Sequence, residues 1–78
     1  MKTVQISLNS IDKVKSFVNE ITKYDYDFDL VSGRYVIDAK SIMGIFSLDL
    51  SKSIDLNIHA DDSEIANVLE TLKPYIVE

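Results

Sequence analysis

The sequence contains no cysteine. This absence excludes disulfide bridges, thiolate chemistry and cysteine-based metal sites, so the stability of the fold must come from packing. The sequence also lacks any run of about 18 consecutive apolar residues, which excludes a membrane-spanning helix. Residues 1–8 include no apolar run long enough for a signal peptide, and we therefore expect a cytoplasmic location.

Basic residues are few and scattered. Eight Lys and Arg stand against thirteen Asp and Glu, which gives a formal net charge of −5. Nucleic acids are bound by clustered Lys and Arg, so we do not expect a nucleic-acid partner. A hydrophobic content of 46% and a charged content of 27% are typical of a folded protein, and the length leaves room for one domain, residues 1–78.

Enzymatic motifs are missing as well. The sequence has no glycine-rich phosphate loop, nucleophile elbow or His-Glu-x-x-His zinc motif, and it predicts no enzyme and no cofactor. The only histidine, His59, has no neighbouring nucleophile, and we interpret it as structural or solvated. Asp25, Asp27 and Asp29 alternate along one segment, with Asp38 nearby, but they lack the glycine and terminal glutamate of a calcium loop. They favour a solvated sheet face over a metal site.

Apolar periodicity predicts an alternation of strands and helices. Period-two patterns in residues 4–8, 24–30, 34–39 and 54–58 indicate four strands. A turn at Ser32-Gly33 joins the second and third strands, and a slip of one residue leaves the side-chain faces unchanged. The residues expected on one face of this hairpin are Tyr26, Phe28, Leu30, Tyr35 and Ile37.

Helical periodicity marks three segments between and after these strands. The first helix is capped by Asn9 or Ser10 and ends near Lys23; the second, short helix covers residues 41–50 and is capped by Ser41. The third begins with a capping box at Asp61 and Glu64, and Pro74 perturbs its last turn. The expected apolar stripes are Ile11, Val14, Phe17, Val18 and Ile21 on the first helix, and Ile65, Val68, Leu69 and Leu72 on the third.

The resulting order, βαββαβα, predicts an α+β fold with two layers, in which the helical stripes cover one face of the sheet. Split-βαβ folds and open-faced β-sandwiches both fit this pattern.

One segment is more specific. Residues 40–50, Lys-Ser-Ile-Met-Gly-Ile-Phe-Ser-Leu-Asp-Leu, resemble the Lys-Ser-Ile-Met-Gly-Val-Met-Ser-Leu-Gly segment of HPr proteins from Gram-positive bacteria. HPr relays a phosphoryl group from enzyme I to sugar permeases in the phosphotransferase system. The resemblance implies an HPr-like open-faced β-sandwich, with a four-stranded antiparallel sheet and three helices on one face.

The carrier site of that family is missing here. In HPr, the phosphorylated histidine lies in a Gly-Leu-His-Ala-Arg-Pro loop between the first strand and the first helix. The corresponding residues 8–14 are Leu-Asn-Ser-Ile-Asp-Lys-Val, with no His, Arg or Pro. Ser10 is nearest to the carrier position, but its phosphate ester would be too stable for a relay. Asp12 could form an acyl phosphate, although without the family's arginine.

The regulatory serine of the family is present. In Gram-positive HPr proteins, the serine of Lys-Ser-Ile-Met-Gly is phosphorylated by a dedicated kinase and controls binding to a transcription factor. Ser41 matches it, and the resemblance implies a partner surface of Lys40, Ile42, Met43 and Phe46. In the simpler interpretation Ser41 is only a helix cap, and Ile42, Met43 and Phe46 belong to the core.

These observations favour a non-catalytic HPr-like protein that binds or regulates protein partners of the phosphotransferase system or of carbon control, possible partners including an HPr-type kinase. Two alternatives stay open: an atypical phosphocarrier that uses Ser10 or Asp12, and an HPr fold reused for an unrelated interaction.

Overall fold

Strands and helices alternate along the chain in the expected order. The computed structural model describes residues 1–77. Its elements are β1 (Lys2–Ile6), α1 (Ile11–Ile21), β2 (Asp27–Ser32), β3 (Tyr35–Asp38), α2 (Ile42–Phe46), β4 (Ile54–His59), α3 (Asp62–Leu72) and a 3₁₀ turn, η1 (Lys73–Tyr75).

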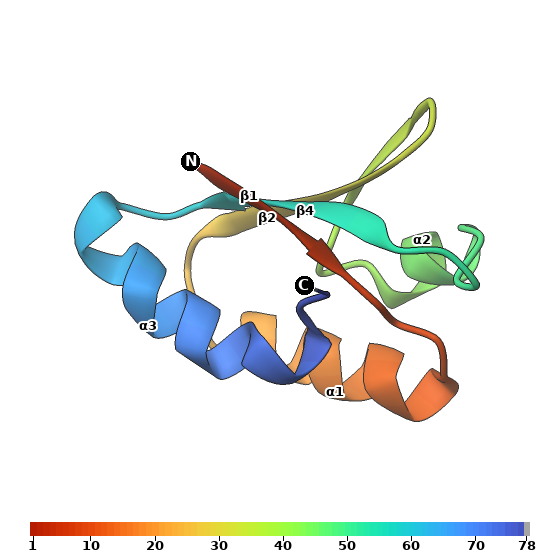
Figure 1. Cartoon of the computed structure of the whole chain (residues 1–78), viewed down its shortest axis with the longest axis horizontal. Coiled ribbons are helices and arrows are strands. Elements are labelled where there is room, and N and C mark those ends of the chain that lie inside the picture. Colours follow the sequence, from red (N-terminus) through yellow and green to blue (C-terminus); the bar gives the residue numbers. More distant parts are fainter. Residues whose placement is uncertain (78) are drawn as a thin grey trace.

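The four strands form one antiparallel sheet in the order β1-β4-β2-β3. Leu30 of β2 lies opposite Leu56 of β4 on one side and Ile37 of β3 on the other. The helices lie on one face of this sheet (Figure 1), and the other face is open. The predicted α+β class and the predicted sheet with three helices on one face are confirmed. Within residues 1–77, no helix combines the length and the apolar character needed to cross a bilayer.

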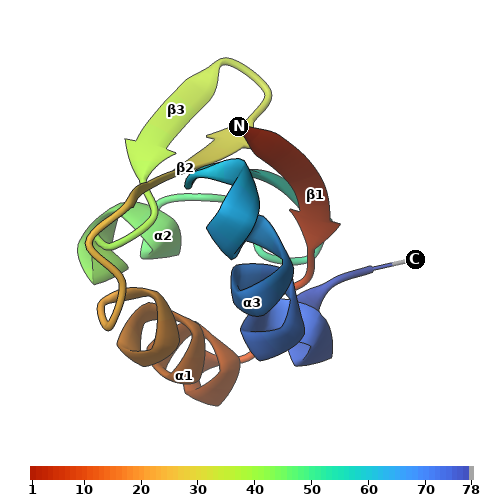
Figure 2. The same cartoon turned by 90° about the vertical axis from the view of Figure 1, so that its left-hand side faces the viewer.

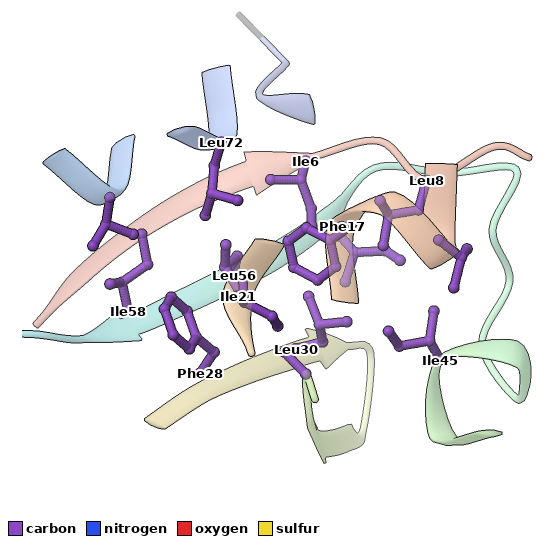
Figure 3. Close-up of a cluster of buried hydrophobic side chains, with 14 of the residues drawn as sticks. Ile6, Leu8, Phe17, Ile21, Phe28, Leu30, Ile45, Leu56, Ile58 and Leu72 are labelled. Atoms are coloured by element: carbon purple, nitrogen blue, oxygen red, sulfur yellow. The ribbon is translucent and has the colours of Figure 1, made fainter. Parts of the chain in front are cut away.

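The core fills the space between the sheet and the helices (Figure 3). Phe17 of α1 and Phe28 of β2 are its largest buried side chains, and burial of such a side chain contributes about 1.5–3 kcal/mol. Every buried side chain in the described residues is apolar. The set is Ile6, Leu8, Val14, Phe17, Ile21, Phe28, Leu30, Ala39, Ile45, Leu48, Ile54, Leu56, Ile58, Ala60, Val68 and Leu72.

Helix α1 has one of its two predicted N-caps, but it does not bury the whole apolar stripe that the sequence predicts. Ser10 is the N-cap, and its Oγ accepts a hydrogen bond from the Lys13 N–H at 3.1 Å. Val14, Phe17 and Ile21 are buried. Ile11, by contrast, is 61% exposed, because the core begins one helical turn further along at Val14. The expectation that Ile11 packs inside was wrong.

Strand β2 begins later than the alternation in residues 24–30 predicts. Asp27 pairs with His59, the last residue of β4. The residues before Asp27 therefore have no partner on β4 and leave the sheet. Tyr24 instead donates or accepts a hydrogen bond with the Thr71 hydroxyl of α3 at 2.7 Å, and its ring stacks on Tyr26.

The β2–β3 hairpin has the one-residue slip that the sequence allowed. Ser32 pairs with Tyr35, so the loop is Gly33-Arg34. Gly33 has φ +59°, and no other residue of the described chain has a positive φ. This is the requirement of a type II′ turn with glycine first. Phe28 and Leu30 are buried as expected, whereas Tyr35 at the tip is 68% exposed.

The C-terminal elements differ from expectation in two details. Asp61 is the N-cap of α3, but its side chain makes no capping hydrogen bond, so the predicted capping box was wrong. Pro74 ends α3 in the turn η1, as expected. The following residues then return to the sheet: Ile76 bridges to Ile6, and the Val77 N–H donates to the Gln5 carbonyl at 2.8 Å.

Candidate functional site

Ser41 lies at the N-cap of α2 with its side chain exposed. Its Oγ accepts a hydrogen bond from the Gly44 N–H at 3.2 Å, which is the capping role that the sequence predicts. Its own N–H donates to the Asp38 carbonyl at 2.9 Å, so the backbone of the cap is anchored to the end of β3. The hydroxyl is thus held in place and accessible from solvent at the same time.

Because Gly44 has no side chain, the Ser41 cap and Ile37 of β3 can both pack close to it. A Cβ at this position would lie 3.2 Å from the Ser41 Oγ and 3.3 Å from the Ile37 Cδ1. Both distances are shorter than ordinary van der Waals contact. A side chain here would therefore press on the cap and on β3 together.

Helix α2 is too short to bury all of its apolar side chains. Ile45 points into the core and Ile42 packs partly against it. Met43 is 77% exposed and Phe46 is 41% exposed. The interpretation that places Met43 and Phe46 in the core was therefore wrong, whereas for Ile42 it is partly right.

A hollow of about 440 Å³ separates the beginning of α1 from the end of α2. Ser10 and Ile11 line it from α1, and Phe46 and Leu50 line it from α2 and the following loop. Sequence reasoning missed Ile11 and Leu50, because both were assigned to helical positions without regard to which helix ends meet. We call Ile11, Phe46 and Leu50, which line the hollow, together with the exposed Met43 of α2, the α1–α2 patch. Asp12, exposed in the first turn of α1, is not among the residues that line the hollow.

Lys40 precedes Ser41 but is directed elsewhere. Its Nζ donates to the Tyr24 carbonyl at 2.8 Å and lies 5.7 Å from the centre of the Phe28 ring. These contacts satisfy one donor of the ammonium and place it over an aromatic face. In this conformation the Lys40 ammonium stabilises the fold beside β2.

Asp49 lies in the loop after α2, and hydrogen bonds from Ser51 change the pKa of its carboxyl group. Its Oδ1 accepts hydrogen bonds from the Ser51 hydroxyl at 2.6 Å and from the Ser51 N–H at 3.1 Å. These bonds favour the charged carboxylate, with a smaller contribution from Lys52, and they lower the pKa of Asp49. The loop beside the α1–α2 patch thus keeps a negative charge down to acidic pH.

His59 lies on the open face of the sheet, away from both helix caps. Its Nε2 is 2.7 Å from the Asp29 Oδ2, and both side chains are partly exposed. Asp27 and Asp38 lie near this pair on the same face. In residues 1–77, no group of three His, Asp or Glu side chains is arranged to hold a metal ion. The structure therefore does not bring His59 together with Ser10 or Ser41.

A protein-family model matches most of the chain. The family model described as "PTS HPr component phosphorylation site" matches residues 13–78. The match begins at Lys13, after Ser10 and Asp12.

Solved HPr structures resemble the chain over nearly its whole length. HPr-C-His from Thermoanaerobacter tengcongensis is 25% identical, with a TM-score of 0.76 over 95% of this chain and 89% of that one. The phosphocarrier protein HPr from Bacillus anthracis str. Ames is 28% identical, with a TM-score of 0.70 over 97% and 94% of the two chains. The histidine-containing phosphocarrier protein of Mycoplasma, 13% identical with a TM-score of 0.69 over 94% and 86%, shares the fold.

Proposed function

Because the chain belongs to the HPr family of the phosphotransferase system, we propose that it is a non-catalytic member that binds and regulates protein partners of that system or of carbon control, with Ser41 as its phosphorylation site. The observation that carries this proposal is the contrast between its two helix caps. At the first, the residues that correspond to the family's carrier loop contain no histidine, and Ser10 is nearest to the carrier position; at the second, Ser41 matches the family's regulatory serine.

The Ser10 cap is poorly suited to phosphoryl relay. A carrier needs a nucleophile whose phosphoryl adduct transfers readily, as a phosphoramidate does. Ser10 offers only an alcohol, and its Oγ already accepts the Lys13 N–H. The sequence around it supplies neither the arginine nor the proline of the family loop.

The Ser41 cap is suited to modification. The exposed hydroxyl is accessible to a kinase, and Met43 beside it is exposed as well. A phosphate on Ser41 adds a charge of about −1.5 to −2 next to the apolar surface of the α1–α2 patch. Such a change alters which partner surfaces the patch binds, because burying a charge against an apolar partner is costly.

Phosphorylation of Ser41 is tested by incubation with an HPr-type kinase and ATP, followed by mass spectrometry. We expect one acid-stable phosphate on Ser41 in the wild type and none in Ser41→Ala. Ser47→Ala is the matched control, since Ser47 lies at the other end of α2 and its removal leaves Ser41 in place. Circular dichroism shows whether Ser41→Ala is folded despite the loss of its cap. Absence of phosphate on folded wild-type protein contradicts the regulatory proposal.

The loss of relay chemistry has a separate test. With phosphoenolpyruvate and enzyme I, we expect no acid-labile adduct, while a histidine-containing HPr in the same mixture becomes phosphorylated. A stoichiometric adduct on the wild type contradicts the proposal. Ser10→Ala and Asp12→Asn then show whether either residue carries it.

A further inference from the structure

Strand β3 is an unprotected edge of the sheet. It is the last strand in the order β1-β4-β2-β3, and Figure 2 shows it as the outermost strand. Tyr35 and Val36 on this strand are 68% and 65% exposed. The opposite edge differs, because Ile76 and Val77 contact β1 there. Exposed edge strands with apolar side chains are templates for pairing with another strand.

The backbone of β3 has hydrogen-bonding groups directed outward. Ser32 and Tyr35 flank the two-residue loop and form its closing hydrogen-bonded pair. Hydrogen-bonded and non-hydrogen-bonded pairs alternate in an antiparallel ladder. Val36, the next residue, therefore has its N–H and C=O turned away from β2 and toward the free edge.

We propose that β3 pairs antiparallel with β3 of a second copy of this chain, about a two-fold axis at Val36. In this register the outward N–H and C=O groups of the two Val36 residues bond to each other. Tyr35 lies opposite Ile37 of the other copy. Arg34, the turn residue directly before β3, comes level with Asp38 at the far end of β3 in the other copy, where its long side chain can reach the carboxylate, and the symmetry produces this pair of opposite charges twice.

The charges at the two ends of β3, Arg34 in the turn before it and Asp38 as its last residue, select a copy of the same segment as the partner. Arg34 and Asp38 are each two residues from Val36, so the segment made of β3 and the preceding turn residue is complementary to itself when it is reversed. No other two-fold register places Arg34 opposite Asp38. A register centred on Asp38 places the two Asp38 carboxylates opposite each other, which is unfavourable.

The proposed dimer is weak. Strand β3 has four residues, and pairing over this length buries less than the roughly 1,600 Å² of a standard interface. We therefore expect association only at high protein concentration. Because its ion pairs are exposed, the dimer should weaken further as ionic strength rises.

The dimer is tested by sedimentation equilibrium and by ¹⁵N–¹H spectra of the wild type from about 10 μM to about 1 mM protein, a range chosen for a weak interface. We expect a rising mean mass, with amide shift changes confined to residues 33–39 and increased hydrogen-exchange protection of the Val36 amide. Arg34→Asp should weaken dimerisation about tenfold, since it replaces two opposite-charge pairs with two like-charge pairs.

Charge reversal provides the matched controls. Lys15→Asp makes the same charge change on exposed α1 and should leave dimerisation unchanged. A mixture of Arg34→Asp with Asp38→Arg should form a heterodimer, because each chain then supplies one sign. If Asp38→Arg fails to fold after losing its bond to the Lys40 N–H, the comparison of Arg34→Asp with Lys15→Asp decides alone. A monomer at about 1 mM, shift changes elsewhere, or equal dimerisation in those two variants overturns the proposal. The proposed function does not depend on this result.

Discussion

Lys40 shows how one side chain can stabilise the fold while its neighbour in sequence is exposed to solvent. Lys40 and Ser41 are adjacent within the segment that resembles HPr. The ammonium of Lys40 nevertheless contacts Tyr24 and Phe28, whereas the hydroxyl of Ser41 faces solvent. Proximity along the chain therefore does not make the two residues one site.

We predict that Lys40→Met lowers the free energy of unfolding by about 1–2 kcal/mol, since it removes a charged hydrogen bond and a cation–π contact. Urea denaturation measures this change. Lys23→Met is the matched control, because the Lys23 ammonium forms an exposed ion pair with Glu20, three residues away, and its side chain is 62% exposed. Its effect should stay within about 0.5 kcal/mol. Equal effects of the two substitutions would show that the Tyr24 carbonyl contact contributes nothing.

At the scale of elements, the loop from α2 to β4 contains a carboxylate, Asp49, whose charged form is stabilised by hydrogen bonds within the same loop. The Ser51 hydroxyl and N–H hold the Asp49 carboxylate, and the pKa of Asp49 is lowered. A carboxyl whose pKa is lower in the folded state contributes stability above its unfolded pKa. That contribution is lost as the pH falls through the folded pKa.

We predict that Ser51→Ala raises the pKa of Asp49 toward its ordinary value, because the hydroxyl is the largest cause of the shift. An NMR titration of the Asp49 side chain between about pH 2 and 6 measures it, a range that brackets aspartate ionisation. Ser53→Ala removes a nearby exposed hydroxyl and should leave the titration unchanged. An unshifted midpoint in Ser51→Ala would contradict the assignment.

The helix caps and strand ends differ in how well the local sequence pattern predicts them. Caps at Ser10 and Ser41 were predictable, because capping depends on the helix start alone. The start of β2 was not predictable, since it depends on where β4 ends, at His59. Within the site, the resemblance to HPr identified Ser41 and Met43. Ile11 and Leu50 needed the packing of α1 against α2 before they could be recognised.

For the whole molecule, the two faces of the sheet have different chemistry. The helix-covered face is entirely apolar among the buried residues, and the open face carries Asp27, Asp29, Asp38 and His59. The α1–α2 patch is formed by side chains of α1, α2 and the loop after α2, whereas the proposed pairing uses the outer backbone groups of β3, against which α2 packs. Partner binding through the patch and pairing through β3 therefore use different residues.

The placement of β1 has a consequence for how the chain folds. Residues 2–6 pair with residues 54–58, and Ile76 and Val77 then contact the outer side of the same strand. Neither neighbour of β1 is close to it in sequence, so its position is fixed only after long loops have closed, which is entropically slow. During synthesis, β1 is made before β4 and before residues 76 and 77, so its pairing partners are missing until they too have been synthesised. The β2–β3 hairpin, closed by a two-residue turn, needs no such delay and is the natural place for structure to begin.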